Sequence, residues 1–137
     1  MTNLPQLPPV IDAYVEALNA GDFPRLMSLF TADALIFGVL GSAPVAKAEA
    51  VWRELHEGMA MNLEPQAVAV DGARVVVRYV ESGRFQGTFR GLEGQAPTGR
   101  SYQVVAIEWF ELEGERIAKR WGARDFDSIK RQVMAAI

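Results

Sequence analysis

The chain has 137 residues, half of them hydrophobic, and carries a formal net charge of −3. An acidic chain is poorly suited to bind nucleic acid or an anionic membrane, both of which attract basic side chains. The sequence has no cysteine and one histidine, which excludes disulfides, zinc–thiolate sites, thiol nucleophiles and histidine-rich metal clusters.

The N-terminal stretch MTNLPQLPPV has no basic region and no long apolar run, so the sequence predicts no signal peptide. No segment approaches the length of a membrane span. There is no internal repeat, linker or low-complexity segment, and the chain is long enough to bury a core. We therefore expect a single cytoplasmic domain over residues 1–137.

Apolar residues at helical spacing, together with capping signals, indicate three helices in the first part of the chain. Proline favours a helix start, glycine favours a helix end, and aspartate can cap a helix N-terminus. The expected elements are a helix from Pro9 to Gly21, a short helix capped by Asp22, a strand over residues 33–41 and a helix from Ser42 to Gly58.

From Gln66 on, the hydrophobic pattern is that of strands. Two hairpins are expected, around Asp71–Gly72 and around Glu113–Gly114, separated by a Gly/Pro-rich loop over residues 91–100. A final helix is capped by Asp127. Helices followed by four long antiparallel strands predict an α+β fold, in which a curved sheet wraps over the helices and encloses a cavity on its concave side.

Two polar side chains fall among apolar ones. Tyr14 lies in the apolar stripe of the first helix, so its buried hydroxyl needs a partner. It either points into a pocket beside Glu108 or bonds to the backbone in a filled core. Glu108 lies on a strand with two largely apolar faces, which indicates a buried central strand. It is either a neutral carboxyl that donates a hydrogen bond, or a carboxylate that reaches solvent or pairs with Arg78 or Arg120.

The stretch YVEALNAGD…LMSLFTADALIF…GS, residues 14–42, resembles the opening of the bacterial ketosteroid isomerases. VAIEWFELEGERI, residues 105–117, is similar to their strand that carries an acidic residue. Those enzymes have the nuclear-transport-factor-2-like fold, a cone of sheet and helices around a pocket. The resemblance implies that Tyr14 and a protonated Glu108 form an oxyanion hole, with two neutral donors aimed at an enolate oxygen.

The second half resembles another family of the same fold. GRFQGTFRG…APTGRSY and ERIAKRWGARDFDSIKRQV are similar to the G-x-F-x-G, P-P-T-G-[KR] and closing tryptophan motifs of the SnoaL-like polyketide and ester cyclases. Both families keep a general base, and this chain departs from both. The isomerase base aligns with Gly38, the cyclase aspartate with Gly122 and the cyclase pocket histidine with Phe85. If the chain is an enzyme of either type, its base lies elsewhere, and Glu81 and an ionised Glu108 are the candidates.

Three classes of function remain open. The first is an acid–base enzyme of cyclase or isomerase type, the second a protein that binds an aromatic or polycyclic compound without transforming it, and the third an assembly module with a filled cavity. Our leading hypothesis is a SnoaL-like protein that binds a hydrophobic carbonyl compound. The candidate catalytic residues are Tyr14, Glu108 and Glu81, and the expected ligand-binding residues are Phe37, Gly38, Phe85, Arg120 and Gly122.

The expected partners follow from the same observations. The sequence implies a small-molecule ligand, no cofactor and no metal, since it has no metal cluster, no dinucleotide fingerprint and no lysine placed for a Schiff base. No nucleic-acid or membrane partner is expected. The resemblance to the cone-shaped families implies a homodimer that pairs through the outer face of the sheet.

Overall fold

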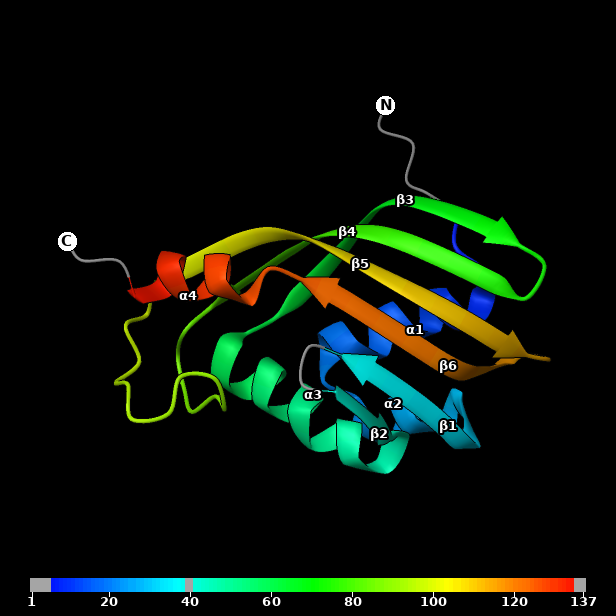
Figure 1. Cartoon of the computed structure of the whole chain (residues 1–137), viewed down its shortest axis with the longest axis horizontal. Helices are drawn as coiled ribbons and strands as arrows, with labels where there is room; N and C mark the ends of the chain where they lie inside the picture. Colours follow the sequence, from blue (N-terminus) through cyan, green and yellow to red (C-terminus); the bar gives the residue numbers. More distant parts are fainter. Residues whose placement is uncertain (1–5, 39–40, 135–137) are drawn as a thin grey trace.

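The computed structural model describes residues 6–38 and 41–134. Its elements in chain order are α1 (Pro9–Ala20), α2 (Phe23–Ser28), β1 (Phe30–Gly38), β2 (Gly41–Pro44), α3 (Val45–Met59), β3 (Asn62–Asp71), β4 (Arg74–Arg84), β5 (Ser101–Glu113), β6 (Arg116–Arg124) and α4 (Phe126–Met134). Helices α1, α2 and α3 lie on one side of the curved sheet, and α4 lies at one end of it (Figure 1). The predicted α+β fold with a curved sheet is confirmed.

The described strands form one sheet in the order β2-β1-β6-β5-β4-β3. Strands β3 to β6 pair antiparallel, as the sequence predicts. Strand β1 adds a feature that the sequence pattern does not reveal, because it runs parallel to β6 and aligns Ile36 with Arg120. This pairing brings the first part of the chain against the strand that carries Gly122.

Both hairpins are present, with each turn one residue further along than expected. Asp71 and Glu113 still belong to their strands, where they pair with Arg74 and Arg116. The turns instead begin at glycines with positive φ, 59° at Gly72 and 62° at Gly114. Glycine takes this left-handed conformation without a steric cost, so it fixes the first turn position.

Helix α3 differs from its predicted bounds at both ends. Ser42 lies in the short strand β2, and the helix begins only after Pro44. Gly58 is not the cap, because the left-handed residue at the helix end is Ala60, with φ 46°. Gly58 lies inside the helix, where a Cβ would overlap the carbonyl of Thr88. Its carbonyl accepts hydrogen bonds from the next loop, so this glycine permits a close approach of that loop.

The remaining helix ends follow simple capping rules. Gly21 terminates α1 in the left-handed conformation, and Asp22 caps α2 by accepting from the amide of Arg25, both as expected. The final helix is capped by Asp125 rather than Asp127, since Asp125 Oδ1 accepts from the amide of Ser128 at 3.0 Å. Asp127 lies within the first turn. Strands β1 and β3 begin earlier than predicted, and residues 39 and 40 of the predicted 33–41 strand lie outside the described residues.

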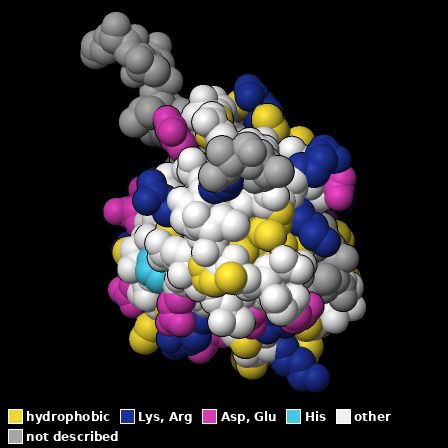
Figure 2. Space-filling view, turned by 90° about the vertical axis from the view of Figure 1, so that its left-hand side faces the viewer, with side chains coloured by type: hydrophobic (Ala, Val, Ile, Leu, Met, Phe, Trp, Pro, Cys, Tyr) yellow, Lys and Arg dark blue, Asp and Glu magenta, His cyan; other side chains and the backbone are white. Residues whose placement is uncertain are grey.

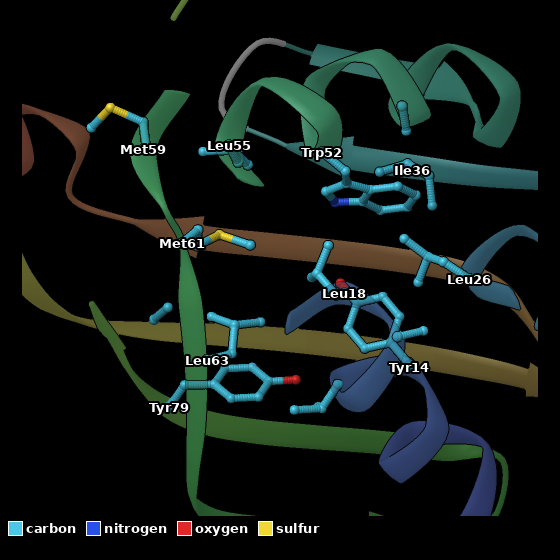
Figure 3. Packing of buried hydrophobic residues seen from close by; sticks show 14 of the residues in the cluster. Tyr14, Leu18, Leu26, Ile36, Trp52, Leu55, Met59, Met61, Leu63 and Tyr79 are labelled. Atoms are coloured by element: carbon cyan, nitrogen blue, oxygen red, sulfur yellow. The ribbon is translucent and has the colours of Figure 1, made fainter. Parts of the chain in front are cut away.

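The core lies between the helices and the concave face of the sheet. Tyr14 and Trp52 project toward each other from α1 and α3, beside Leu18 and Ile36 (Figure 3). The Tyr14 ring meets the ring of Phe110 edge to face at a centroid distance of 5.1 Å. The sequence predicts that β5 is buried on both faces, and this is wrong for the single chain. The outer face of β5 is exposed. It exposes apolar side chains of Val105 (57%), Ile107 (44%) and Trp109 (41%).

Candidate functional site

A cavity of about 280 Å³ lies between the sheet and the helices. Its roof is apolar and is built from α1, α3, β3, the loop between β4 and β5 and the first residue of α4; it includes Leu18, Trp52, Leu55, Leu63, Phe89 and Phe126. Its floor is polar and is built from β4, β5 and β6; it includes Glu81, Glu108, Arg120 and Arg124. An apolar cavity with a few converging polar groups has the composition of a small-molecule site.

The first of two buried polar clusters, here the first cluster, joins Tyr14, Glu108 and Arg120. The Tyr14 hydroxyl donates to Glu108 Oε2 at 2.8 Å, and Arg120 Nε donates to the same oxygen at 2.6 Å. Arg120 Nη2 also pairs with this oxygen. Acceptance from several donors, one of them a guanidinium, is the bonding pattern of a carboxylate. Of the alternatives open for Glu108, the structure has the arginine pair.

Gly122 makes the first cluster possible. It faces Glu108 across the β5–β6 pair, whereas Arg120 faces Phe110 two residues further along. Arg120 must therefore lean over position 122 to reach Glu108, and a Cβ there would overlap the guanidinium. Gly122 is the position at which the resemblance to the cyclases would place an aspartate. In this chain the missing side chain leaves the space that the Arg120 guanidinium occupies.

Burial and charge act together in the first cluster. Burial, and then the negative charge of Glu108, raise the pKa of Tyr14 well above its ordinary value. Burial alone would lower the pKa of Arg120, but the charge of Glu108, the neighbouring Tyr14 and the hydrogen bond to Glu108 together outweigh it, so the pKa is raised. Near neutral pH the cluster therefore holds a protonated phenol and a charged guanidinium.

A second cluster repeats this arrangement with Tyr102, Glu81 and Arg124. The Tyr102 hydroxyl donates to Glu81 Oε2 at 2.7 Å, and Arg124 Nη1 donates to the same oxygen at 2.6 Å. Arg124 Nη1 also lies 3.6 Å from the sulfur of Met61. Burial, and then the charge of Glu81, raise the pKa of Tyr102. Both clusters thus have one tyrosine, one glutamate and one arginine from β6.

Two buried polar atoms beside these clusters have no hydrogen-bond partner among the described residues. They are Glu108 Oε1 and the hydroxyl of Tyr79. Burial, followed by the charge of Glu108, raises the pKa of Tyr79. Glu108 therefore keeps one oxygen with unused acceptor capacity.

The loop between β4 and β5, here the cavity loop, lines one side of the cavity. Arg90 in this loop lines the cavity and donates from its backbone amide and its Nε to the two carboxylate oxygens of Glu54 on α3, both at 3.0 Å. The hydrogen bond from the Arg90 side chain lowers the pKa of Glu54. The end of the molecule where α4 and the loop lie has uncharged and hydrophobic side chains at its centre and charged ones around them (Figure 2).

The model of the SnoaL-like domain matches residues 11–120 of the sequence. The chain belongs to the SnoaL-like family. Among solved structures, this SnoaL-like protein is similar to IdmH from Streptomyces antibioticus, provisionally assigned as a polyketide cyclase, with a TM-score of 0.80 and 22% identity over 93% of this chain and 97% of that one. No protein with a curated function matches the sequence.

Two other solved structures have a similar fold at similarly low sequence identity. TsrD from Streptomyces laurentii gives a TM-score of 0.79 and 22% identity over 96% of this chain and 100% of that one. AclR from Streptomyces galilaeus, provisionally assigned as a hydroxylase, gives 0.80 and 16% identity over 93% and 80%. At these identities the likeness establishes the fold of this SnoaL-like protein and leaves its reaction to the site.

The structure brings five of the eight predicted site residues to the cavity wall: Gly38, Glu81, Glu108, Arg120 and Gly122. Three are not among the lining residues. Tyr14 is fully buried and its hydroxyl donates to Glu108 rather than into the cavity. Phe37 stacks on Trp121 at 4.8 Å. Because neighbouring strand residues point to opposite faces, Phe37 and Gly38 cannot both face the cavity.

The third is Phe85, which is fully buried. Its backbone pairs with Arg100 and Gly99 where the chain leaves β4. The sequence reasoning did not identify the second cluster as a unit. Strand alternation contained the necessary information, because Tyr102 and Glu108 share one parity on β5 and Arg124 shares that of Gly122 on β6.

Within residues 6–38 and 41–134, no three histidine, aspartate or glutamate side chains gather in a way that could hold a metal ion. Over the same ranges, none of the helices combines the length and the hydropathy needed to cross a bilayer.

Proposed function

We propose that this SnoaL-like protein binds an aromatic or polycyclic carbonyl compound in the cavity, with Arg120 as the donor to a ligand oxygen. The observation that carries the proposal is the difference in exposure within the first cluster. The Arg120 side chain is 16% accessible, whereas that of Glu108 is 5% accessible and Tyr14 is fully buried. The guanidinium is therefore the group that a ligand meets.

This arrangement differs from the oxyanion hole that the resemblance implies. In that arrangement, two neutral donors would both reach the ligand. Here Tyr14 and Glu108 orient Arg120, and a cation meets the ligand oxygen. A guanidinium in a largely apolar cavity stabilises a developing negative charge on oxygen more strongly than it does in water.

The size and walls of the cavity support a compact aromatic ligand. Its volume of about 280 Å³ lies at the lower end of the usual range for ligand pockets, roughly 300–1,000 Å³. Trp52, Phe89 and Phe126 offer flat apolar contacts. We infer that two or three fused rings fit better than a larger polycycle.

The test is a fluorescence titration with 2-naphthol, a bicyclic phenol that mimics an enolate. The double variant Arg120→Met/Glu108→Gln removes the donor without leaving an unpaired charge. We expect about tenfold weaker binding, as for loss of one charge-assisted hydrogen bond. The control is Arg53→Met/Glu49→Gln, which removes an exposed pair on α3. Equal binding by all three proteins would contradict the proposal.

A second candidate function, acid–base catalysis, is favoured by the unpaired Glu108 Oε1. In an enolisation, the C–H bond beside the ligand carbonyl breaks, the proton moves to this oxygen, and the electron pair moves onto the carbonyl oxygen beside Arg120. In a conjugated enolate, return of the proton from Glu108 to another carbon would give an isomer. Attack of the enolate carbon on a second carbonyl would give a ring, with the proton passing from Glu108 to the new alkoxide.

Enolisation is testable without knowledge of the substrate. We expect the protein to accelerate exchange of deuterium from D₂O into 2-tetralone, as followed by proton NMR. Glu108→Gln should abolish the acceleration if Glu108 is the base, whereas loss only in Glu81→Gln would assign this role to Glu81. If deuterium exchanges into 2-tetralone no faster than in buffer alone, acid–base catalysis is contradicted and only the binding function remains.

We also propose that the protein forms a homodimer through the outer face of the sheet. The exposed apolar side chains of β1 and β5 support this: Leu35, Val105, Ile107 and Trp109. A contiguous apolar sheet face is typical of a protein interface. Ile107→Lys should give a monomer by sedimentation velocity, whereas Val70→Lys, at a similarly exposed position on β3, should not. A wild-type monomer at micromolar concentration would contradict the proposal.

A further inference from the structure

The two polar clusters share their chemistry, and both of their arginines come from β6, but the proposed ligand contact uses only the first cluster. Arg120 and Arg124 both extend from β6 into the cavity, each bound to a glutamate that accepts from a tyrosine. The second cluster therefore offers a ligand the same kind of donor as the first.

The exposure pattern is also the same in both clusters. The side chain of Arg124 is 16% accessible and that of Glu81 only 2%, matching the 16% and 5% of Arg120 and Glu108. A guanidinium has five N–H donors. Within the part of the chain that the structure describes, Arg124 donates only from Nη1, so other N–H groups of this side chain are left for a ligand oxygen.

The spacing of the two arginines sets the distance between the donors. Residues four apart on a strand have Cα atoms about 13 Å apart. Arg120 leans over Gly122 toward Arg124, but Arg124 reaches Glu81, which is level with Val104 and so lies two residues beyond the Arg124–Ala106 pair, away from Arg120. Both side chains lean in the same direction, so the two guanidiniums remain about 13 Å apart along the strand. The residue of β5 that lies between the levels of Glu108 and Glu81 has a small side chain, Ala106, and it lines the cavity. A flat body of two fused rings fits over this part of the floor.

Fold stability alone does not account for the second cluster. A buried ion pair is often no more stabilising than apolar residues of the same volume, because both ions lose their hydration. Here the arginine end remains accessible in a cavity whose roof is apolar. A partly dehydrated guanidinium of this kind contributes most to ligand binding, where a bound oxygen replaces the water that it has lost.

We propose that Arg124, held by Glu81 and Tyr102, forms a second oxygen-binding subsite, so that the ligand is an aromatic compound with oxygen functions at both ends. The inference rests on the proposed function and adds a substrate class to it, a dioxygenated bicyclic or tricyclic compound. Hydroxyl, carbonyl and enolate oxygens all satisfy the chemistry of the subsite.

The experiment compares 2-naphthol with 2,6-dihydroxynaphthalene, which adds one hydroxyl at the far end of the same ring system. The readout is the ratio of the two dissociation constants. We expect the second hydroxyl to improve binding to the wild type by about tenfold. In Arg124→Met/Glu81→Gln, the ratio should fall to the statistical factor of about two for two equivalent hydroxyls. The exposed-pair variant Arg53→Met/Glu49→Gln should keep the wild-type ratio.

The outcomes separate the two proposals. If neither probe binds the wild type, the proposed function fails and this inference fails with it. If 2-naphthol binds and the added hydroxyl brings no more than the statistical factor, only the second subsite is overturned. A ratio that stays high in Arg124→Met/Glu81→Gln would also overturn it, since the hydroxyl would then bind elsewhere.

A measurement on the wild type covers the case in which the double variant does not fold. The ¹⁵N–¹H signal of Arg124 Nε should shift on addition of 2,6-dihydroxynaphthalene by more than it does with 2-naphthol. An Arg124 signal that responds equally to both probes, or to neither, would overturn the subsite.

Discussion

At the scale of single residues, Tyr14 and Tyr79 are a natural comparison. Both phenols are fully buried, but the Tyr14 hydroxyl donates to Glu108 whereas the Tyr79 hydroxyl has no partner among the described residues. Tyr14→Phe should therefore lower the free energy of unfolding by about 1.5–3 kcal/mol, the usual contribution of a hydrogen bond to a charged group. Tyr79→Phe should leave it unchanged or raise it. Urea unfolding of both variants checks this, and equal losses would contradict the assignment of partners.

Two of the glycines that line the cavity, Gly122 and Gly38, give a second comparison at this scale. A Cβ at Gly122 would overlap the Arg120 guanidinium, whereas a Cβ at Gly38 would have no heavy atom closer than 4.0 Å. We expect Gly122→Ala to push Arg120 off Glu108 and to destabilise the protein by about 3 kcal/mol, as when a buried pair is broken. Gly38→Ala should change the melting temperature little. If both variants melt alike, Gly122 is not what makes room for Arg120.

At the scale of elements, the contact between α3 and the cavity loop has its own pH dependence. Arg90 lowers the pKa of Glu54, so Glu54 stabilises the fold above its unfolded pKa near 4.5, and this contribution is lost as the pH falls through the lower folded pKa. Glu54→Gln should cost up to about 1 kcal/mol at pH 7, since both side chains are partly exposed. The difference from the wild type should vanish on acidification.

The matched control for the loop lies on the same helix. Glu49 pairs with Arg53 along α3 and does not touch the loop. Glu49→Gln should leave proteolysis of the loop at neutral pH unchanged, whereas Glu54→Gln should accelerate it, because only the second substitution releases Arg90. Equal cleavage rates in the two variants would show that the ion pair does not hold the loop.

At the scale of the whole molecule, all three tyrosines of the chain are buried and have raised pKa values. The unfolded chain loses its phenolic protons near pH 10, whereas the folded state keeps them. Above pH 10 the unfolded state therefore binds fewer protons, and stability falls as the pH rises. We expect the tyrosinate absorbance to appear only together with loss of the circular dichroism of the fold. A tyrosine that ionises while the fold persists would contradict this burial.

The sequence predicts the fold of the whole molecule better than it predicts the site. Hydrophobic period, caps and turn glycines are local, so the helices and both hairpins could be located to within a few residues. The parallel contact of β1 with β6 is not local, and it decides what faces Gly38. The alternation of side chains along the strands could place Glu108 and Gly122 on one face of the sheet. It could not show that the Arg120 side chain crosses Gly122 to bind Glu108. This contact depends on the space left by a missing Cβ.

The proposed function depends on one contact, that of a ligand oxygen with Arg120 in the cavity. A crystal structure of the complex with 2-naphthol tests it most directly. We predict that the naphthol oxygen lies about 3 Å from a nitrogen of Arg120, while Glu108 keeps its bonds to Tyr14 and Arg120. A naphthol oxygen bound instead between Tyr14 and Glu108, with Arg120 turned away, would contradict the account and restore the two-donor oxyanion hole.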